Sequence, residues 1–228
     1  MKNLRLWHGS AHSKKIRQLY LSFFFISLVS LIATTALADP NVTLNKPATL
    51  NGLFGVLRAG SIWDPNQPLG TAGTIDDGIF FQEQTLWNQG SIWWDATVQG
   101  SENNTIVIDL QGAYHITGII TQADNNDNYN IEYFNPFTST WTELGYWLPI
   151  DGWGLMTRPS GDQVTPFPIT FDASMIRLSA FNNEFGGDSY FSYSEFQAFG
   201  TSVPEPVTML LLGSGLLGLW GFRKKFRK

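Results

Sequence analysis

The sequence predicts an all-β sandwich domain between two targeting segments. Short apolar segments rich in β-branched and aromatic residues recur between turn-forming residues from residue 105 to residue 200. No stretch between residues 39 and 200 keeps the hydrophobic period of about 3.6 residues that marks a helix. Helices are therefore expected only in the two flanking segments, as an N-terminal signal helix and a C-terminal transmembrane helix.

The N-terminal segment, residues 1–38, has the three-part layout of a secretory signal peptide. A long basic region precedes an apolar run from Leu19 to Ala33, and Ala36 and Ala38 form a small-x-small cleavage site. Asp39 is therefore the expected first residue of the mature chain. An uncleaved N-terminal anchor is the alternative, and the short apolar run argues against it. We expect export across the inner membrane.

The mature domain, residues 39–200, is long enough to bury one core. Gly112 and the Asn135-Pro136 pair are expected to mark turns between strands. The segment from residue 50 to residue 96 is rich in Gly, Asn, Asp and Trp, so it is expected to form loops at one end of the sandwich, where binding sites commonly lie. Six strands are expected in Thr105–Leu110, Tyr114–Thr121, Asn130–Phe134, Trp141–Trp147, Met175–Phe181 and Tyr190–Phe199.

An uncharged apolar run from residue 207 to residue 222 predicts the transmembrane helix. Its length falls somewhat below the roughly 20 residues that usually span a bilayer, but flanking basic side chains extend the span by snorkelling. Five basic residues lie between residues 223 and 228, and they are expected to stay cytoplasmic. The rest of the chain is then expected on the outer side of the membrane.

Pro204, Glu205 and Pro206 precede this run and separate it from the domain, because proline does not continue a helix. The order of Pro-Glu-Pro, apolar span and basic end resembles the PEP-CTERM sorting signal of Gram-negative bacteria. The resemblance implies that an exosortase, a membrane-embedded cysteine protease-transpeptidase, recognises residues 201–228 and cleaves at or near the motif. The membrane span is then transient, and the protein reaches the cell surface or extracellular matrix. An ordinary permanent anchor is the alternative.

Composition narrows the functions open to the mature domain. It keeps four Lys/Arg against eighteen Asp/Glu, a net charge of −14, which disfavours binding to nucleic acid or an anionic membrane surface. It has no cysteine and one histidine, His115, so disulfides and a cysteine nucleophile are excluded and a histidine-based metal or triad site nearly so. No Gly-x-Ser-x-Gly element occurs, and we expect no enzymatic activity.

Several motifs follow one another along the domain: Asn41–Ala48 with Lys-Pro-Ala, Asp77-Gly78 followed by Thr85 and Trp87, Ile106–Gly112, Tyr129–Phe134 and Ser194–Gly200. In this order they resemble the discoidin-type domain, also called coagulation factor type C or galactose-binding-like, which is a jelly-roll β-sandwich. The resemblance implies a structural Ca²⁺. Its ligands would come from loop carbonyls and from Asp77, Thr85 and Glu195, with Asp76 as a substitute, since hard cations prefer several oxygens. Alternatively, Asp76-Asp77-Gly78 is only a turn and Glu195 is solvated.

A ligand site is expected in the loops. Asp124 and Asn125 begin an acidic amide loop, residues 124–128, which is either a ligand or cation site or a solvated turn. Trp153 lies between two glycines and is expected to be exposed for stacking on a sugar, while core packing is expected for most other tryptophans. Arg158 is expected in a loop, where it would be free to bind a ligand.

These features predict a non-enzymatic, exported protein whose sandwich binds extracellular polysaccharide or surface glycan. One alternative is a purely structural component of the extracellular matrix without a sugar pocket. The other is a carbohydrate-active enzyme that uses a pair of its many carboxylates.

Overall fold

The computed structural model describes residues 38–101, 103–147, 152–159, 163–181, 188–204, 211 and 213–215. The expected signal peptide, apart from Ala38, and most of the expected transmembrane helix lie outside these residues. Within the part of the chain that the structure describes, no helix is long and apolar enough to cross a membrane. The elements described below all belong to one compact unit, Asp39–Lys228.

The described domain is built almost entirely from strands, and every described pairing between them is antiparallel. The elements are β1 (Ala48–Asn51), the 3-10 helix η1 (Ala72–Ile75), β2 (Ile92–Asp95), β3 (Thr105–Asp124), β4 (Tyr129–Asn135), β5 (Thr140–Trp147), β6 (Leu155–Arg158), β7 (Phe167–Ala180) and β8 (Tyr190–Ser202). The predicted all-β class is confirmed.

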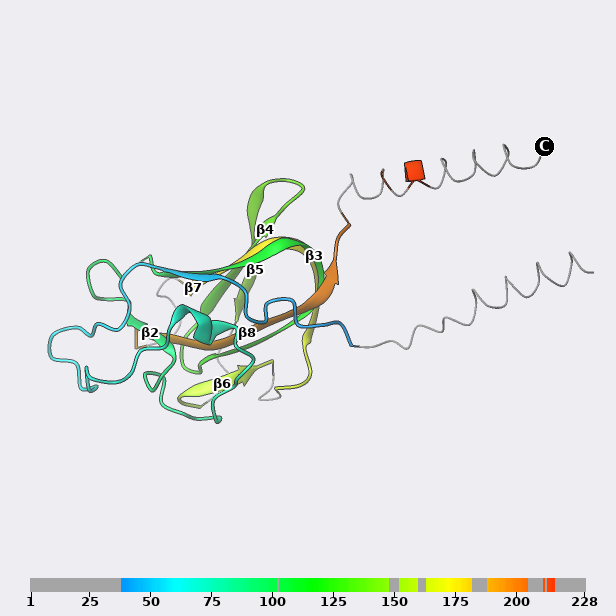
Figure 1. Cartoon of the computed structure of the whole chain (residues 1–228). Helices are drawn as coiled ribbons and strands as arrows, with labels where there is room; N and C mark the ends of the chain where they lie inside the picture. The colour runs from blue at the N-terminus through cyan, green and yellow to red at the C-terminus, as the bar shows by residue number, and fades with distance from the viewer. Residues whose placement is uncertain are drawn as a thin grey trace, which may run out of the picture. The chain divides into compact units, whose positions relative to one another are not determined.

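One sheet with the strand order β2-β8-β3-β7-β4-β5 curls over on itself, and β1 and β6 both pair with β3 (Figure 1). The curl brings strands from separate parts of the sheet into contact. The Tyr129 ring of β4 lies 4.6 Å from the Tyr193 ring of β8 and 5.7 Å from that of Phe191. The core between these layers is lined by the apolar side chains of β3, β7 and β8.

The predicted turn at Gly112 is wrong. Residues 105–124 form one strand, and its pairing with β7 shifts register between Asp109 and Tyr114. Gln111, with φ 59°, bends the strand within this shift. The strand does not reverse there, because β7 stays paired with it on both sides of the bend. The predicted turn after Asn135 is confirmed, since Asn135 and Thr140 close the β4–β5 hairpin.

The segment from residue 50 to residue 96 is mostly irregular, as expected, but it ends in β2. Trp93 and Trp94 of this strand are buried, because β2 pairs with β8 and presents both faces to packed side chains. Trp94 packs in the main core, with its ring 5.5 Å from that of Phe191. A separate aromatic cluster contains Trp87, Trp93 and Tyr190, with Leu57 and Trp63 packed against them.

Strand β8 joins the two ends of the domain. Asp95 at the end of β2 pairs with Tyr190 at the start of β8, and β3 ends at Asp124 beside the same part of β8. We call this end of the sandwich the loop end. At its other extremity β8 reaches Ser202, beside the first described residues of the domain (Figure 1).

Candidate ligand-binding site at the loop end

A group of buried polar side chains lies at the loop end. We call Asp124, Asn125, Asp127, Asn128 and Arg158 the polar cluster; all are buried. The first four follow one another where β3 turns into β4, and the last ends β6. Pairing of β3 with β6 joins these segments. The structure therefore brings together residues that lie about thirty positions apart in the sequence.

Arg158 is buried, which corrects the expectation of a free loop residue. Its side chain is 1% exposed, its Nη2 donates to the Asp124 carbonyl at 2.7 Å, and its guanidinium lies 5.3 Å from the Tyr129 ring centre. Burial lowers the pKa of Arg158, although neighbours including Asp124 and Asp127 oppose this shift. Pairing with β3 draws the residue inward, where an aromatic face and two carboxylates surround the cation.

The two carboxyl groups of the polar cluster hold protons more tightly than exposed carboxyls do. Burial raises the pKa of Asp124 to about 7. Burial, together with the charge of Asp124, raises the pKa of Asp127 to about 9. Exposed Asp188 raises both values further, while Arg158 lowers them. At neutral pH the pair therefore offers both a donor and an acceptor of hydrogen bonds.

Several buried atoms around Arg158 have no hydrogen-bond partner among the described residues. They are Nε and Nη1 of Arg158, both amide atoms of Asn128 and the Tyr193 hydroxyl. Native proteins satisfy nearly all such groups. Leaving one unsatisfied typically costs about 1–3 kcal/mol. The cluster is therefore suited to bonding with a small polar group that enters it.

Trp153 lies beside the polar cluster and is 56% exposed. The next residue, Gly154, accepts the Asn125 N–H at 3.0 Å. Gly154 has a φ of 74°, and a Cβ there would lie 2.5 Å from the Thr85 carbonyl oxygen, so the close approach requires glycine. The four candidate ligand residues, Trp153, Arg158, Asp124 and Asn125, thus share the loop end, and their role in binding stays a prediction.

Removing the Asp127 carboxyl is expected to flatten the pH dependence of stability. Its pKa rises from 3.8 to about 9 on folding, so its contribution is complete below about pH 4 and is lost as the pH rises toward 9. One pKa unit corresponds to about 1.4 kcal/mol, or roughly 3 °C in a domain of this size. Between about pH 5 and 9, the melting temperature of Asp127→Asn should fall several degrees less than that of the wild type. Parallel melting profiles for the two proteins would contradict this assignment.

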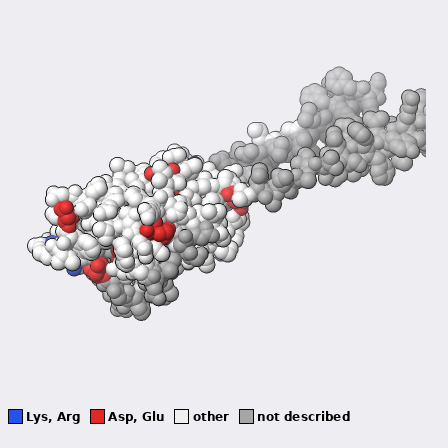
Figure 2. All heavy atoms as spheres, turned by 90° about the horizontal axis from the view of Figure 1, so that it is seen from below, with Lys and Arg blue, Asp and Glu red and all other residues white. Residues whose placement is uncertain are grey.

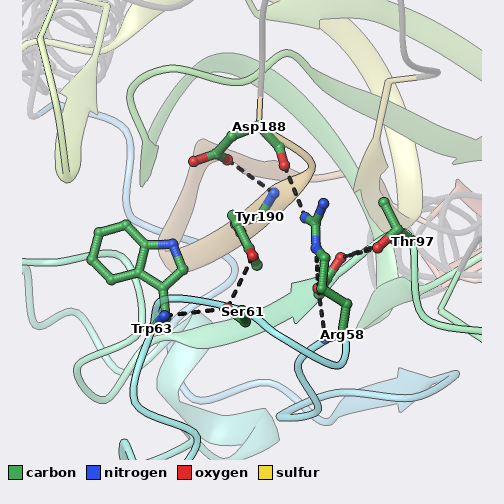
Figure 3. Close-up of polar contacts among 7 residues, drawn as sticks. Arg58, Ser61, Trp63, Thr97, Asp188 and Tyr190 are labelled. Atoms are coloured by element: carbon green, nitrogen blue, oxygen red, sulfur yellow. Dashed lines mark hydrogen bonds and ion pairs between the residues drawn. The ribbon is translucent and has the colours of Figure 1, made fainter.

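Sequence reasoning missed a second group at the loop end, built around Arg58 (Figure 3). The Arg58 Nε donates to the buried carboxylate of Asp95 at 2.7 Å, and its Nη2 donates to the Asp188 carbonyl at 2.9 Å. The guanidinium lies 4.2 Å from the Tyr190 ring centre, and the Tyr190 hydroxyl bonds to Ser61 at 2.9 Å. The available signal was that Arg58 is one of only four basic residues in the mature domain.

Asp95 anchors this second group. Burial acts to raise its pKa, but hydrogen bonds from Arg58 and Thr97 outweigh burial and lower it. Asp95 therefore stays ionised and holds Arg58 in place. Arg58 in turn ties the loop after β1 to the segment before β8, which fixes one wall of the loop end.

The predicted calcium ligands lie at a different place, where β8 passes the Asp76-Asp77-Gly78 turn. The Gly78 N–H donates to Glu195 Oε1 at 3.2 Å, whereas Glu195 Oε2 and both carboxylate oxygens of buried Asp76 have no well-formed hydrogen bond among the described residues. Burial raises the pKa of Asp76 to about 6 and that of Glu195 to about 8, and the Asp77 charge adds to both shifts. These orphaned oxygens fit a hard cation.

One of the predicted calcium ligands, Thr85, makes other contacts. Thr85 instead donates its hydroxyl to the Gln82 carbonyl at 2.7 Å and bridges to Leu155. Within the described ranges, no group of three or more His, Cys, Asp or Glu side chains is already arranged to hold a metal ion. Calcium at Asp76, Asp77 and Glu195 therefore stays a prediction.

Comparison with known proteins identifies the C-terminal segment. Residues 202–228 match the family model of the PEP-CTERM protein-sorting motif. The chain carries a PEP-CTERM sorting motif. This confirms the prediction made from Pro204, Glu205 and Pro206, and it indicates export through a membrane-anchored sorting intermediate. No curated protein matches the chain in sequence.

Solved structures similar to the domain are discoidin-like, galactose-binding-type domains. One is the family 32 carbohydrate-binding module of Clostridium perfringens NanJ in complex with galactose, with TM-score 0.45, 14% identity and coverage of 72% of this chain and 99% of that one. A fucolectin from striped bass, Morone saxatilis, has TM-score 0.47 and 15% identity, covering 75% and 52%. A Streptococcus pneumoniae fucose-binding module has TM-score 0.42 and 15% identity, covering 71% and 95%.

Proposed function

We propose that this PEP-CTERM protein is processed by an exosortase, reaches the cell surface or extracellular matrix, and binds a neutral glycan or polysaccharide at the loop end. The role is binding, without catalysis. The observation that carries the proposal is the exposed indole of Trp153 next to buried polar groups that lack partners within the described part of the chain.

A sugar has an apolar face of C–H groups and a set of polar hydroxyls, and the loop end offers an aromatic side chain for the first and unsatisfied polar groups for the second. The ring of a sugar presents C–H groups that pack on an indole, which supplies apolar contact at little entropic cost. Its hydroxyls need donors and acceptors at fixed positions, and the Asn128 amide and the Arg158 guanidinium supply both. Hydrogen bonds to charged groups are stronger than those between neutral groups. Arg158 is therefore the residue that we expect to orient the bound sugar.

Charge favours a neutral ligand over an acidic one. Acidic side chains are scattered over the face seen in Figure 2, which shows hardly any basic ones. All four basic side chains of the mature domain lie over aromatic rings: Lys46 on Tyr114, Arg58 on Tyr190, Arg158 on Tyr129 and Arg177 on Trp141. Three of these are also engaged by carboxylates or carbonyls. A domain of this charge repels polyanions such as uronic-acid polymers.

Trp153→Ala is expected to weaken glycan binding at least about tenfold, which corresponds to roughly 1.4 kcal/mol. Affinity electrophoresis or titration calorimetry against a panel of neutral polysaccharides would measure it. Phe137→Ala is the matched control, because Phe137 is also exposed, at 60%, but lies in the β4–β5 turn. If the wild-type domain binds no saccharide, including the polysaccharide of the producing cell, the binding function is wrong and the matrix role takes its place.

The carbohydrate-active enzyme alternative has one feature in its favour, the raised pKa values of Asp124 and Asp127. Turnover of a polysaccharide that is lost in Asp124→Asn would establish this alternative.

A further inference from the structure

The PEP-CTERM motif and the β-sheet share residues. The family match begins at residue 202, and β8 ends at the same residue, Ser202, which pairs with Tyr114 of β3. Val203 still donates its N–H to the Ala113 carbonyl at 2.8 Å. Pro204, which has no N–H to donate, is the first residue beyond this pairing. No linker therefore separates the folded sheet from the Pro-Glu-Pro sequence.

The other edge of β8 is also held near the motif. Val42 donates its N–H to the Ala198 carbonyl at 2.8 Å, and Gly200 donates to the Pro40 carbonyl at 3.1 Å. On the β3 side, a Cβ at Gly200 would lie 2.2 Å from the His115 carbonyl oxygen, so only glycine permits this approach. The end of β8 is thus enclosed between β3 and the start of the mature chain.

We propose that the folded sheet restrains the PEP-CTERM motif, so that the sorting protease engages it only after residues 201–203 detach from β3. This rests on the proposed exosortase processing. Extended peptides are commonly recognised through their backbone N–H and C=O groups, and the N–H of Val203, the residue just before Pro204, is already committed to the Ala113 carbonyl of β3. Detachment is a local opening, and when reclosing is fast, processing follows the population of the open form.

A cross-strand disulfide at Tyr114 and Ser202 tests this restraint. The Val203–Ala113 hydrogen bond makes this a non-hydrogen-bonded pair, whose Cα atoms lie about 4.5 Å apart, within the range of disulfides. The full chain has no other cysteine. In a bacterium with PEP-CTERM sorting, pulse-chase analysis of the oxidised Tyr114→Cys/Ser202→Cys chain should show processing at least about tenfold slower than that of the wild type. Reductant should restore the rate.

Two controls separate restraint from other effects. Asn51→Cys/Thr105→Cys links β1 to β3 away from the motif and should be processed at the wild-type rate. A short Gly-Ser linker inserted between Val203 and Pro204 should make the Tyr114–Ser202 crosslink harmless. Unchanged processing of the oxidised variant, or slowing that persists after reduction, overturns the proposed restraint. A wild-type chain that is never processed contradicts the exosortase assignment itself.

Discussion

Arg158→Met is expected to lower the free energy of unfolding of the mature domain by about 3–5 kcal/mol at pH values slightly above 7, where Asp124 is ionised, because it leaves this carboxylate in the interior without its cation. Arg158 is only 1% exposed and lies beside Asp124 and Asp127, so solvent screens this interaction little. Methionine keeps much of the apolar contact with the Tyr129 ring, which confines the change to the charge and its hydrogen bonds. Chemical denaturation monitored by tryptophan fluorescence would measure the loss.

Arg177→Met is the matched control. Arg177 also pairs with a carboxylate, Glu132, at 2.5 and 2.6 Å, and lies over a ring, but both side chains of the pair keep contact with solvent. Its loss should cost less than about 1 kcal/mol. Adding Asp124→Asn to Arg158→Met should recover part of the stability, since it removes the carboxylate whose charge the cation offset. Equal losses at both arginines would contradict the assigned role of Arg158.

Calcium removal is expected to lower the melting temperature of the mature domain by roughly 5–10 °C. We propose that one Ca²⁺ is held at Asp76, Asp77 and Glu195, where buried oxygens of Asp76 and Glu195 lack well-formed hydrogen bonds among the described residues. At a calcium concentration about 100 times the Kd, binding adds about 2.7 kcal/mol to stability, and about 2–4 °C follows from each kcal/mol in a domain of this size. Thermal scans with calcium and with chelator would measure the difference.

Glu195→Gln should abolish this calcium response, because the amide carries no charge to hold the cation. Glu143→Gln provides the control, since Glu143 is an exposed carboxylate on β5. It should keep the full response. Superimposable melting curves of the wild type with and without chelator would remove the calcium assignment.

Strands with a strong local pattern could be predicted closely. The segment expected at residues 130–134 became β4 (Tyr129–Asn135), and the one expected at 141–147 became β5 (Thr140–Trp147), because alternation and a turn define this hairpin locally. β1, β2 and β6 were missed. Each has four residues, and each exists only because a partner distant in the sequence supplies its hydrogen bonds.

The candidate site also contains residues that the sequence could predict and residues that it could not. Trp153 could be singled out because flanking glycines indicated an exposed loop. The burial of Arg158 could not, since an arginine before a proline resembles a loop residue until β6 pairs with β3. No sequence motif surrounds Arg58, so its contacts could not be predicted. Its role depends on Asp95 and Asp188, which lie far from it in the sequence.

The sorting motif of this protein can be identified from its linear sequence. The PEP-CTERM motif, the expected signal peptide and the all-β class can be predicted from residue order, composition and local hydrophobic period. Sorting proteases and signal peptidases recognise short contiguous segments, and local strand patterns also depend on neighbouring residues. The polar cluster around Arg158, the orphaned oxygens of Asp76 and Glu195, and the pairing of Val203 with Ala113 are visible only in the folded chain. Burial and strand pairing arise from contacts between distant segments, and these contacts set the charge state, exposure and accessibility of each residue.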